Sequence, residues 1–194
     1  MKYKKHLFIF TLVYFLLGII NIHFALVALF CLMFPIILLV ATKRKIWCQG
    51  YCPRANLFTV CTKSAKCSRK TPRFFVTGSM KWIVLVYFLF NLTIITATTI
   101  RVSSGVVMPM NSLRFLLFMQ LPFDLPQLFH FDNVAPWITH LSFRLYSMMM
   151  TTTFIGFILA LIYKPRTWCA ICPISTVSGL YLKRLKRKPL VNNS

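Results

Sequence analysis

Two short cysteine motifs hold the residues of this chain that are best suited to chemistry. Residues 47–53 read Trp-Cys-Gln-Gly-Tyr-Cys-Pro, and residues 168–173 read Trp-Cys-Ala-Ile-Cys-Pro. Each motif follows a long apolar segment and a short basic stretch, and the first cysteines of the two motifs are 121 residues apart. Two pairs of thiols delivered to one membrane face supply four ligands, the number that a cubane iron–sulfur cluster needs.

The composition predicts that lipid surrounds most of the chain. Of its 194 residues 58% are hydrophobic, and only Asp124 and Asp132 carry a carboxylate side chain. Residues 7–42 contain no Asp, Glu, Lys or Arg. As one helix this run would be ~54 Å long, against a hydrocarbon core of about 30 Å. The run is therefore expected to fold back near residues 18–23, where Asn21 and His23 supply a polar break.

We expect an all-α membrane protein with one domain (1–194) and four transmembrane helices arranged as two hairpins. The helices are expected at about 5–20, 24–41, 82–100 and 145–163. Loops 42–81 and 164–194 then carry the cysteine–proline motifs on one face, after helices two and four. Loop 101–144 lies on the other face. Within it, residues 113–121 are apolar but too short to span, which predicts an interfacial or re-entrant helix.

The positive charge predicts the orientation. The N-terminus, residues 42–81 and residues 164–194 share one face and hold 3, 10 and 7 Lys or Arg, which is 20 of the 23 in the chain. The positive-inside rule makes this face cytoplasmic, with both termini inside. Its basic segments are expected to contact anionic lipid headgroups. Because topology already explains the charge, binding to nucleic acid is not expected.

The cysteines are interpreted from this topology. Six of the seven are expected on the cytoplasmic side, where thiols stay reduced, so metal ligation or redox chemistry is favoured over disulfides. One site built from the two repeated pairs uses four of them. Cys61 and Cys67 then remain as extra thiols or as substitutes in a less symmetric site. Cys31, inside the second helix, is expected to be a small packing residue.

The two motifs and their position after membrane helices resemble the polytopic 4Fe-4S-binding membrane proteins. Larger relatives in that family include membrane subunits of the electron supply systems of nitrate reductase and nitrous oxide reductase. The resemblance rests on Cys48-x-x-x-Cys52-Pro53-Arg54-x-x-Leu57-Phe58 and on Lys164-Pro165-Arg166-Thr167-Trp168-Cys169-x-x-Cys172-Pro173.

The resemblance implies a membrane-bound electron-transfer protein of the prokaryotic cytoplasmic membrane, more a subunit than an independent enzyme. It implies one [4Fe-4S] cluster at the cytoplasmic membrane surface, with iron ligated by Cys48, Cys52, Cys169 and Cys172. The redox partner would be a ferredoxin, a flavoprotein or a quinone. This chain departs from the larger relatives because its second motif has two residues between the cysteines and because no ferredoxin module follows.

Two other interpretations of the thiols stay open. The four cysteines also suit a structural zinc site, although zinc pairs usually lie in soluble, charged small folds. A membrane thiol–disulfide or quinone oxidoreductase also combines four helices with paired cysteines, but its redox pairs belong on the oxidising outer face. His23 and His140 are placed to meet at the outer ends of helices two and four. An interfacial or turn role is the commoner explanation for such histidines than haem ligation.

Overall fold

The computed structural model describes residues 6–45, 47–62, 71–72, 74–75, 78–110, 112–115, 119–120 and 134–187, with the backbone alone for residues 48, 49, 119, 120, 186 and 187. The elements in chain order are α1 (Leu7–Ile20), the 3₁₀ helix η2 (Ile22–Leu26), α2 (Val27–Thr42), the π-helical turn η3 (Trp47–Tyr51), α3 (Pro53–Cys61), α5 (Met80–Ser103), β1 (Arg114–Phe115), β2 (Met119–Gln120), α6 (Pro136–Ile162), α7 (Thr167–Ile171) and α8 (Pro173–Arg187).

Three helices in the described part of the chain are long and apolar enough to cross a membrane. They are Ile22–Thr42, Met80–Ser103 and Pro136–Ile162, with 21, 24 and 27 residues. The apolar α1 has 14 residues and is therefore ~21 Å long, shorter than a hydrocarbon core of about 30 Å. The structure thus shows a helical chain with three candidate spans, whereas the four-span, two-hairpin topology remains a prediction.

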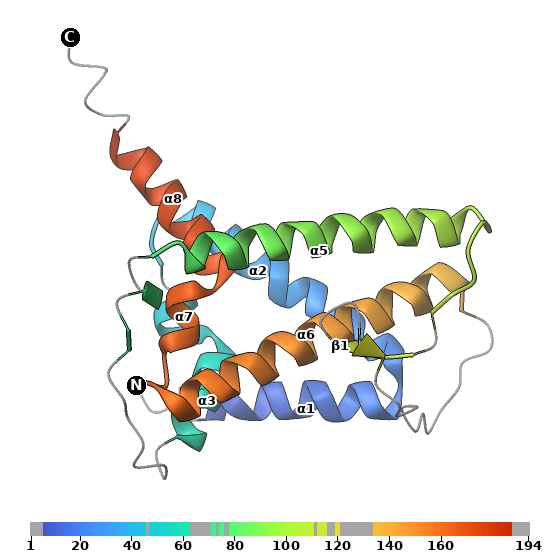
Figure 1. Cartoon of the computed structure of the whole chain (residues 1–194), viewed down its shortest axis with the longest axis horizontal. Coiled ribbons are helices and arrows are strands. Elements are labelled where there is room, and N and C mark those ends of the chain that lie inside the picture. Colours follow the sequence, from blue (N-terminus) through green and yellow to red (C-terminus); the bar gives the residue numbers. More distant parts are fainter. Residues whose placement is uncertain are drawn as a thin grey trace.

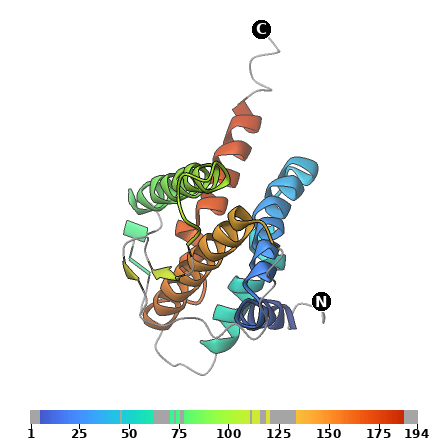
Figure 2. The ribbon, with the colours of Figure 1, turned by 90° about the vertical axis from the view of Figure 1, so that its right-hand side faces the viewer.

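Helix α6 is the centre of the fold. Figure 2 shows it between α5 on one side and the α1 and α2 pair on the other. In Figure 1, α1 and α5 run in one direction and α2 and α6 in the other, so α3, α7 and α8 gather at one end of the bundle. This end carries both cysteine motifs.

Helix α6 begins nine residues before the predicted start at residue 145. Pro136 stands at its first turn, a position that needs no backbone N–H. The extra turns contain buried polar residues, with His140 at 3% and Ser142 at 0% exposure. Apolar counting alone does not assign such residues to a membrane helix, so the sequence placed them in the outer loop.

The chain reverses between α1 and α2 where the sequence predicts a fold-back. Asn21 takes an extended conformation, and its side-chain oxygen accepts a hydrogen bond from the backbone N–H of His23 at 2.9 Å. Just before the turn, a Cβ at Gly18 would overlap the ring of Tyr146 on α6. Glycine at this position therefore lets α1 approach α6 closely.

The helix predicted over residues 113–121 is wrong for the residues described there. Arg114–Phe115 and Met119–Gln120 form a short antiparallel pair instead. The backbone N–H of Arg114 donates to Ser147 Oγ at 3.2 Å, and Ser147 lies eleven residues, ~16 Å, along α6. Pairing between strands and bonds to α6 satisfy backbone groups that a helix would have satisfied internally. Arg114 therefore lies beside the middle of α6.

Candidate functional site

Each cysteine motif ends with its second cysteine at the N-cap of a helix whose first residue is proline. Cys52 precedes Pro53 at the start of α3, with φ −71° and ψ 113°. Cys172 precedes Pro173 at the start of α8, with φ −58° and ψ 130°. The two cysteines therefore share almost the same backbone conformation. Proline suits the first helical position in both, because its missing N–H has no partner there.

The unequal spacing of the motifs is absorbed within one helical turn. The N–H of Cys52 donates to the carbonyl of Trp47, five residues earlier, at 3.0 Å. The N–H of Cys172 donates to the carbonyl of Trp168, four residues earlier, at 2.9 Å. The first motif thus makes a π turn and the second an α turn. The extra residue of the first motif consequently leaves the pose of its second cysteine unchanged.

Both motifs contribute to one cavity of about 40 Å³. Its lining includes three of the four predicted ligands, Cys52, Cys169 and Cys172, and the remaining lining residues are Cys31, Trp47, Arg54, Ala55, Trp168, Ile174 and Ser175. We call this space the cysteine cavity. The backbone of Cys48 lies in the π turn beside it, and its side chain lies outside the described part.

The two cysteines considered as substitutes do not line the cysteine cavity in the described structure. Cys61 is exposed at the far end of α3, nine residues and ~13 Å along the helix from Cys52. Cys67 lies outside the described residues.

Cys31, which was expected to be a packing residue of the second helix, also lines the cysteine cavity. It lies eleven residues, ~16 Å, before the end of α2, so the cavity reaches into the bundle, deeper than the surface position expected from the sequence. Ala28 and Pro35 are both buried and lie three residues before and four residues after it. The three residues therefore lie on one inward face of α2.

Arg54 places a positive charge beside the thiols. Its guanidinium donates to Thr152 Oγ1 at 2.8 Å and to Met149 Sδ at 3.1 Å, both on α6, and it also hydrogen-bonds Cys31. These bonds fix the start of α3 against the middle of α6. The Arg54 side chain therefore connects α3 to α6. It is also the cation in the described lining of the cysteine cavity.

The pKa of the Cys172 thiol is set by opposing effects of burial and of nearby positive groups. Burial raises its pKa, while the backbone amides of Ser175 and Ile174 and the charge of Arg54 oppose the rise. Amides at the start of a helix stabilise a thiolate, so they offset part of the effect of burial on Cys172.

Packing behind the cavity joins both motifs to α6. Phe58 of α3 is fully buried, Trp168 of α7 is 8% exposed, and both belong to one apolar cluster. A Cβ at Gly156 would lie 2.6 Å from Phe58 Cζ and 3.2 Å from Trp168 Cγ. Gly156 is thus the point of α6 on which α3 and α7 converge.

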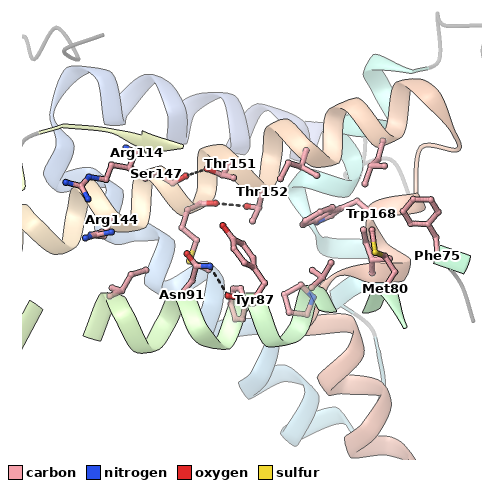
Figure 3. Close-up of a pocket in the computed structure, with 18 residues that line it drawn as sticks. Phe75, Met80, Tyr87, Asn91, Arg114, Arg144, Ser147, Thr151, Thr152 and Trp168 are labelled. Carbon is pink, nitrogen blue, oxygen red and sulfur yellow. Dashed lines mark hydrogen bonds between the residues drawn. The ribbon is translucent and has the colours of Figure 1, made fainter. Parts of the chain in front are cut away.

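A second, larger cavity of about 320 Å³ lies between α5 and α6 (Figure 3). Trp168 and Phe75 stand at one end, and Arg114 and Arg144 stand at the other. Because Trp168 also lines the cysteine cavity, one indole separates the two spaces.

A third cavity of about 250 Å³ lies on the α1 and α2 side and shares Cys31, Trp47 and Arg54 with the cysteine cavity. Two of its lining residues, Thr11 and Thr153, have buried hydroxyls without a hydrogen-bond partner in the described part of the chain. Apolar space with a few polar groups is typical of ligand pockets.

His23 and His140 each form hydrogen bonds with other residues. His23 lies 2.7 Å from Asn21 Oδ1 through Nδ1 and 3.2 Å from Thr139 Oγ1 through Nε2. His140 accepts the N–H of Met110 on Nδ1 at 3.1 Å. His23 therefore lies at the turn between α1 and α2, while His140 ties α6 to the segment that contains Met110.

Among the residues with described side chains, no three His, Cys, Asp or Glu side chains are grouped to hold a single metal ion. The fold defines a helical protein with three apolar helices long enough to cross a membrane. No protein-family model, curated protein or solved structure matches the chain.

Proposed function

We propose that this chain is a membrane electron-transfer protein that carries one [4Fe-4S] cluster between its two cysteine motifs. Cys48, Cys52, Cys169 and Cys172 would be its ligands. The observation that supports the proposal most directly is the convergence of both motifs on the cysteine cavity, from segments more than one hundred residues apart. The matching conformation of Cys52 and Cys172 adds to it.

The groups around the thiols suit an anionic, thiolate-bound cluster. The amides of Ile174 and Ser175 and the guanidinium of Arg54 supply positive electrostatic potential at the sulfur atoms. Such hydrogen bonds and charges set the potential of iron–sulfur clusters. Trp47 and Trp168 cover the cavity with indole rings that limit the access of water. When bound, the cluster would supply reversible one-electron transfer.

The surroundings of the cavity offer two kinds of electron partner. Exposed Lys183 and Arg184 on α8 would dock an acidic ferredoxin or flavoprotein at the cytoplasmic face, close to anionic lipid headgroups. A quinone would instead enter the pocket that shares Cys31 and Trp47 with the cysteine cavity. There the free hydroxyls of Thr11 and Thr153 are donors for its carbonyl oxygens.

Metal analysis distinguishes this function from its rivals. Protein purified without oxygen is expected to contain about four irons and four acid-labile sulfides per chain, with an EPR signal that appears on reduction by dithionite. Zinc without sulfide would show that the two motifs form a structural zinc site. Absence of both metals, with a disulfide that forms and breaks between the cysteines, would indicate a thiol–disulfide oxidoreductase.

Serine substitution then tests the ligands. Loss of Cys48, Cys52, Cys169 or Cys172 is expected to abolish cluster binding. The matched control is Cys61→Ser, because Cys61 is exposed at the far end of the same helix that begins after Cys52. Retention of a complete cluster after the joint substitution of Cys169 and Cys172 would contradict the site built from two motifs.

A further inference from the structure

The cavity between α5 and α6 ends at a pair of arginines that no other described group neutralises. Arg114 comes from β1 and Arg144 from α6, and Figure 3 shows both at the end of the cavity away from Trp168. Both side chains are half-buried. Their Nε atoms are buried without a hydrogen-bond partner in the described part of the chain. Two like charges held together in this way repel each other and attract an anion.

The depth of the two arginines in the helix bundle is a second reason to expect a bound anion. Arg144 lies eight residues, ~12 Å, along α6 from Pro136, and α6 is a candidate membrane span. Arg114 is held at a similar depth by the bond from its backbone N–H to Ser147 and by its pairing with Gln120. A cation inside a membrane helix bundle is costly unless it is paired, and it usually marks a binding site.

The rest of the cavity is apolar and long. Its α6 wall extends from Arg144 to Leu159, fifteen residues or ~22 Å, which is longer than half of a hydrocarbon core of about 30 Å. Two polar side chains along the wall, Asn91 and Thr151, already have partners within their own helices. Asn91 donates to the carbonyl of Tyr87 at 2.8 Å, and Thr151 donates to that of Ser147 at 2.8 Å.

We propose that this cavity binds an anionic phospholipid, with its phosphate between Arg114 and Arg144 and one acyl chain along α5 and α6 toward Trp168. Guanidinium groups match phosphate oxygens in geometry and charge. A neutral quinone head would leave two buried cations uncompensated, so a charged head fits the pair better. This lipid site goes beyond electron transfer and does not depend on the cluster.

The chain offers two internal competitors for the arginines. Its only side-chain carboxylates, Asp124 and Asp132, both fall outside the described residues, and either would neutralise a guanidinium. The test therefore has to distinguish a lipid phosphate from an aspartate of the same chain.

Native mass spectrometry of the whole protein in neutral detergent measures lipid retention. With equal amounts of phosphatidylglycerol and phosphatidylcholine, we expect about one phosphatidylglycerol per chain and a preference of tenfold or more. The joint change Arg114→Gln and Arg144→Gln should remove the preference. Arg101→Gln is the matched control, because Arg101 is an exposed arginine at the end of α5 that does not line the cavity. Equal retention in the double variant would overturn the proposal.

Two further measurements keep the test decisive if the double variant does not fold. Thermal unfolding of the unaltered protein should shift upward with phosphatidylglycerol but not with phosphatidylcholine or inorganic phosphate. An equal shift with inorganic phosphate would reduce the site to a free anion site. Asp124→Asn with Asp132→Asn should leave the lipid preference intact. If the preference appears only in that variant, the aspartates occupy the arginines and the proposal fails. Iron content, measured in parallel, reports on the cluster separately.

Discussion

Replacing Gly156 by alanine should loosen both cysteine motifs at once. The added Cβ would lie 2.6 Å from Phe58 Cζ, 2.9 Å from Phe58 Cε2 and 3.2 Å from Trp168 Cγ. Ordinary contacts at a Cβ begin near 3.4 Å, so the Phe58 ring has to retreat by nearly 1 Å. That ring is fully buried and has no open side. Displacing it moves α3, which begins just after Cys52.

The size of the effect follows from two opposing contributions. Overpacking of a close-packed interior typically costs about 1–3 kcal/mol. The change from glycine to alanine inside a helix returns about 0.5–1 kcal/mol of that. The difference between these two terms is a net loss of stability of about 0–2.5 kcal/mol, with a central value of about 1 kcal/mol. The expected geometric consequence is larger reactivity of Cys169 and Cys172, because a shift of Trp168 would widen the cavity that all three residues line.

The assay compares Gly156→Ala with Gly18→Ala, because Gly18 has the same kind of close contact with Tyr146, where α1 meets α6 before the η2 turn. Both variants should unfold at lower temperature in detergent. Only Gly156→Ala should accelerate alkylation of Cys169 and Cys172 in metal-free protein and lower the iron retained after gel filtration. Equal alkylation rates in the two variants would refute the role of Gly156 as the shared support of the motifs.

Three other changes test the site. Arg54→Gln should lower the potential of the one-electron cluster couple by about 90 mV, because a charge at a separation of about 8 Å with an effective dielectric constant of about 20 contributes ~2 kcal/mol. An EPR-monitored redox titration measures this, and Arg54→Lys, which keeps the charge, should shift the potential much less. In metal-free protein, Cys172 should be alkylated more slowly than exposed Cys61 at pH 8, because burial raises the pKa of Cys172 and leaves less thiolate; a faster rate at Cys172 would contradict the burial argument. Deletion of Gly50 should convert the π turn of the first motif into an α turn and keep Cys52 at its N-cap, so the iron content should stay within about twofold of the unaltered protein. Complete loss of iron would show that the π turn itself is required.

The sequence predicts those features that depend on local composition. The apolar runs locate α2, α5 and most of α6, and Asn21 marks the reversal between α1 and α2. The repeated order of tryptophan, cysteine and proline indicates that the two motifs act together, and the structure brings Cys52, Cys169 and Cys172 to one cavity. Each of these predictions needs only a pattern along the chain.

The features that the sequence does not predict depend on contacts between distant segments. Cys31 lines the cavity because α3 folds back against α1 and α6, which no local pattern near Cys31 reveals. The guanidinium of Arg54 bonds Thr152, ninety-eight positions away. The first turns of α6 are helical although they are polar, because residues such as His23 of η2 and Met110 contact them. A search for runs of apolar residues does not identify a helix whose polar residues are buried by distant parts of the chain.

The π turn at Trp47–Tyr51 has a consequence for how the first motif can vary. Because one turn accommodates the additional residue, insertions and deletions within this turn should leave the start of the following helix α3 unchanged. The two motifs are then interchangeable parts: a chimera with residues 168–173 transplanted over 47–53 should keep the second cysteine in its place. The two halves of the chain therefore share the backbone conformation of the second cysteine and its place before a helix. They do not share a fixed spacing between cysteines.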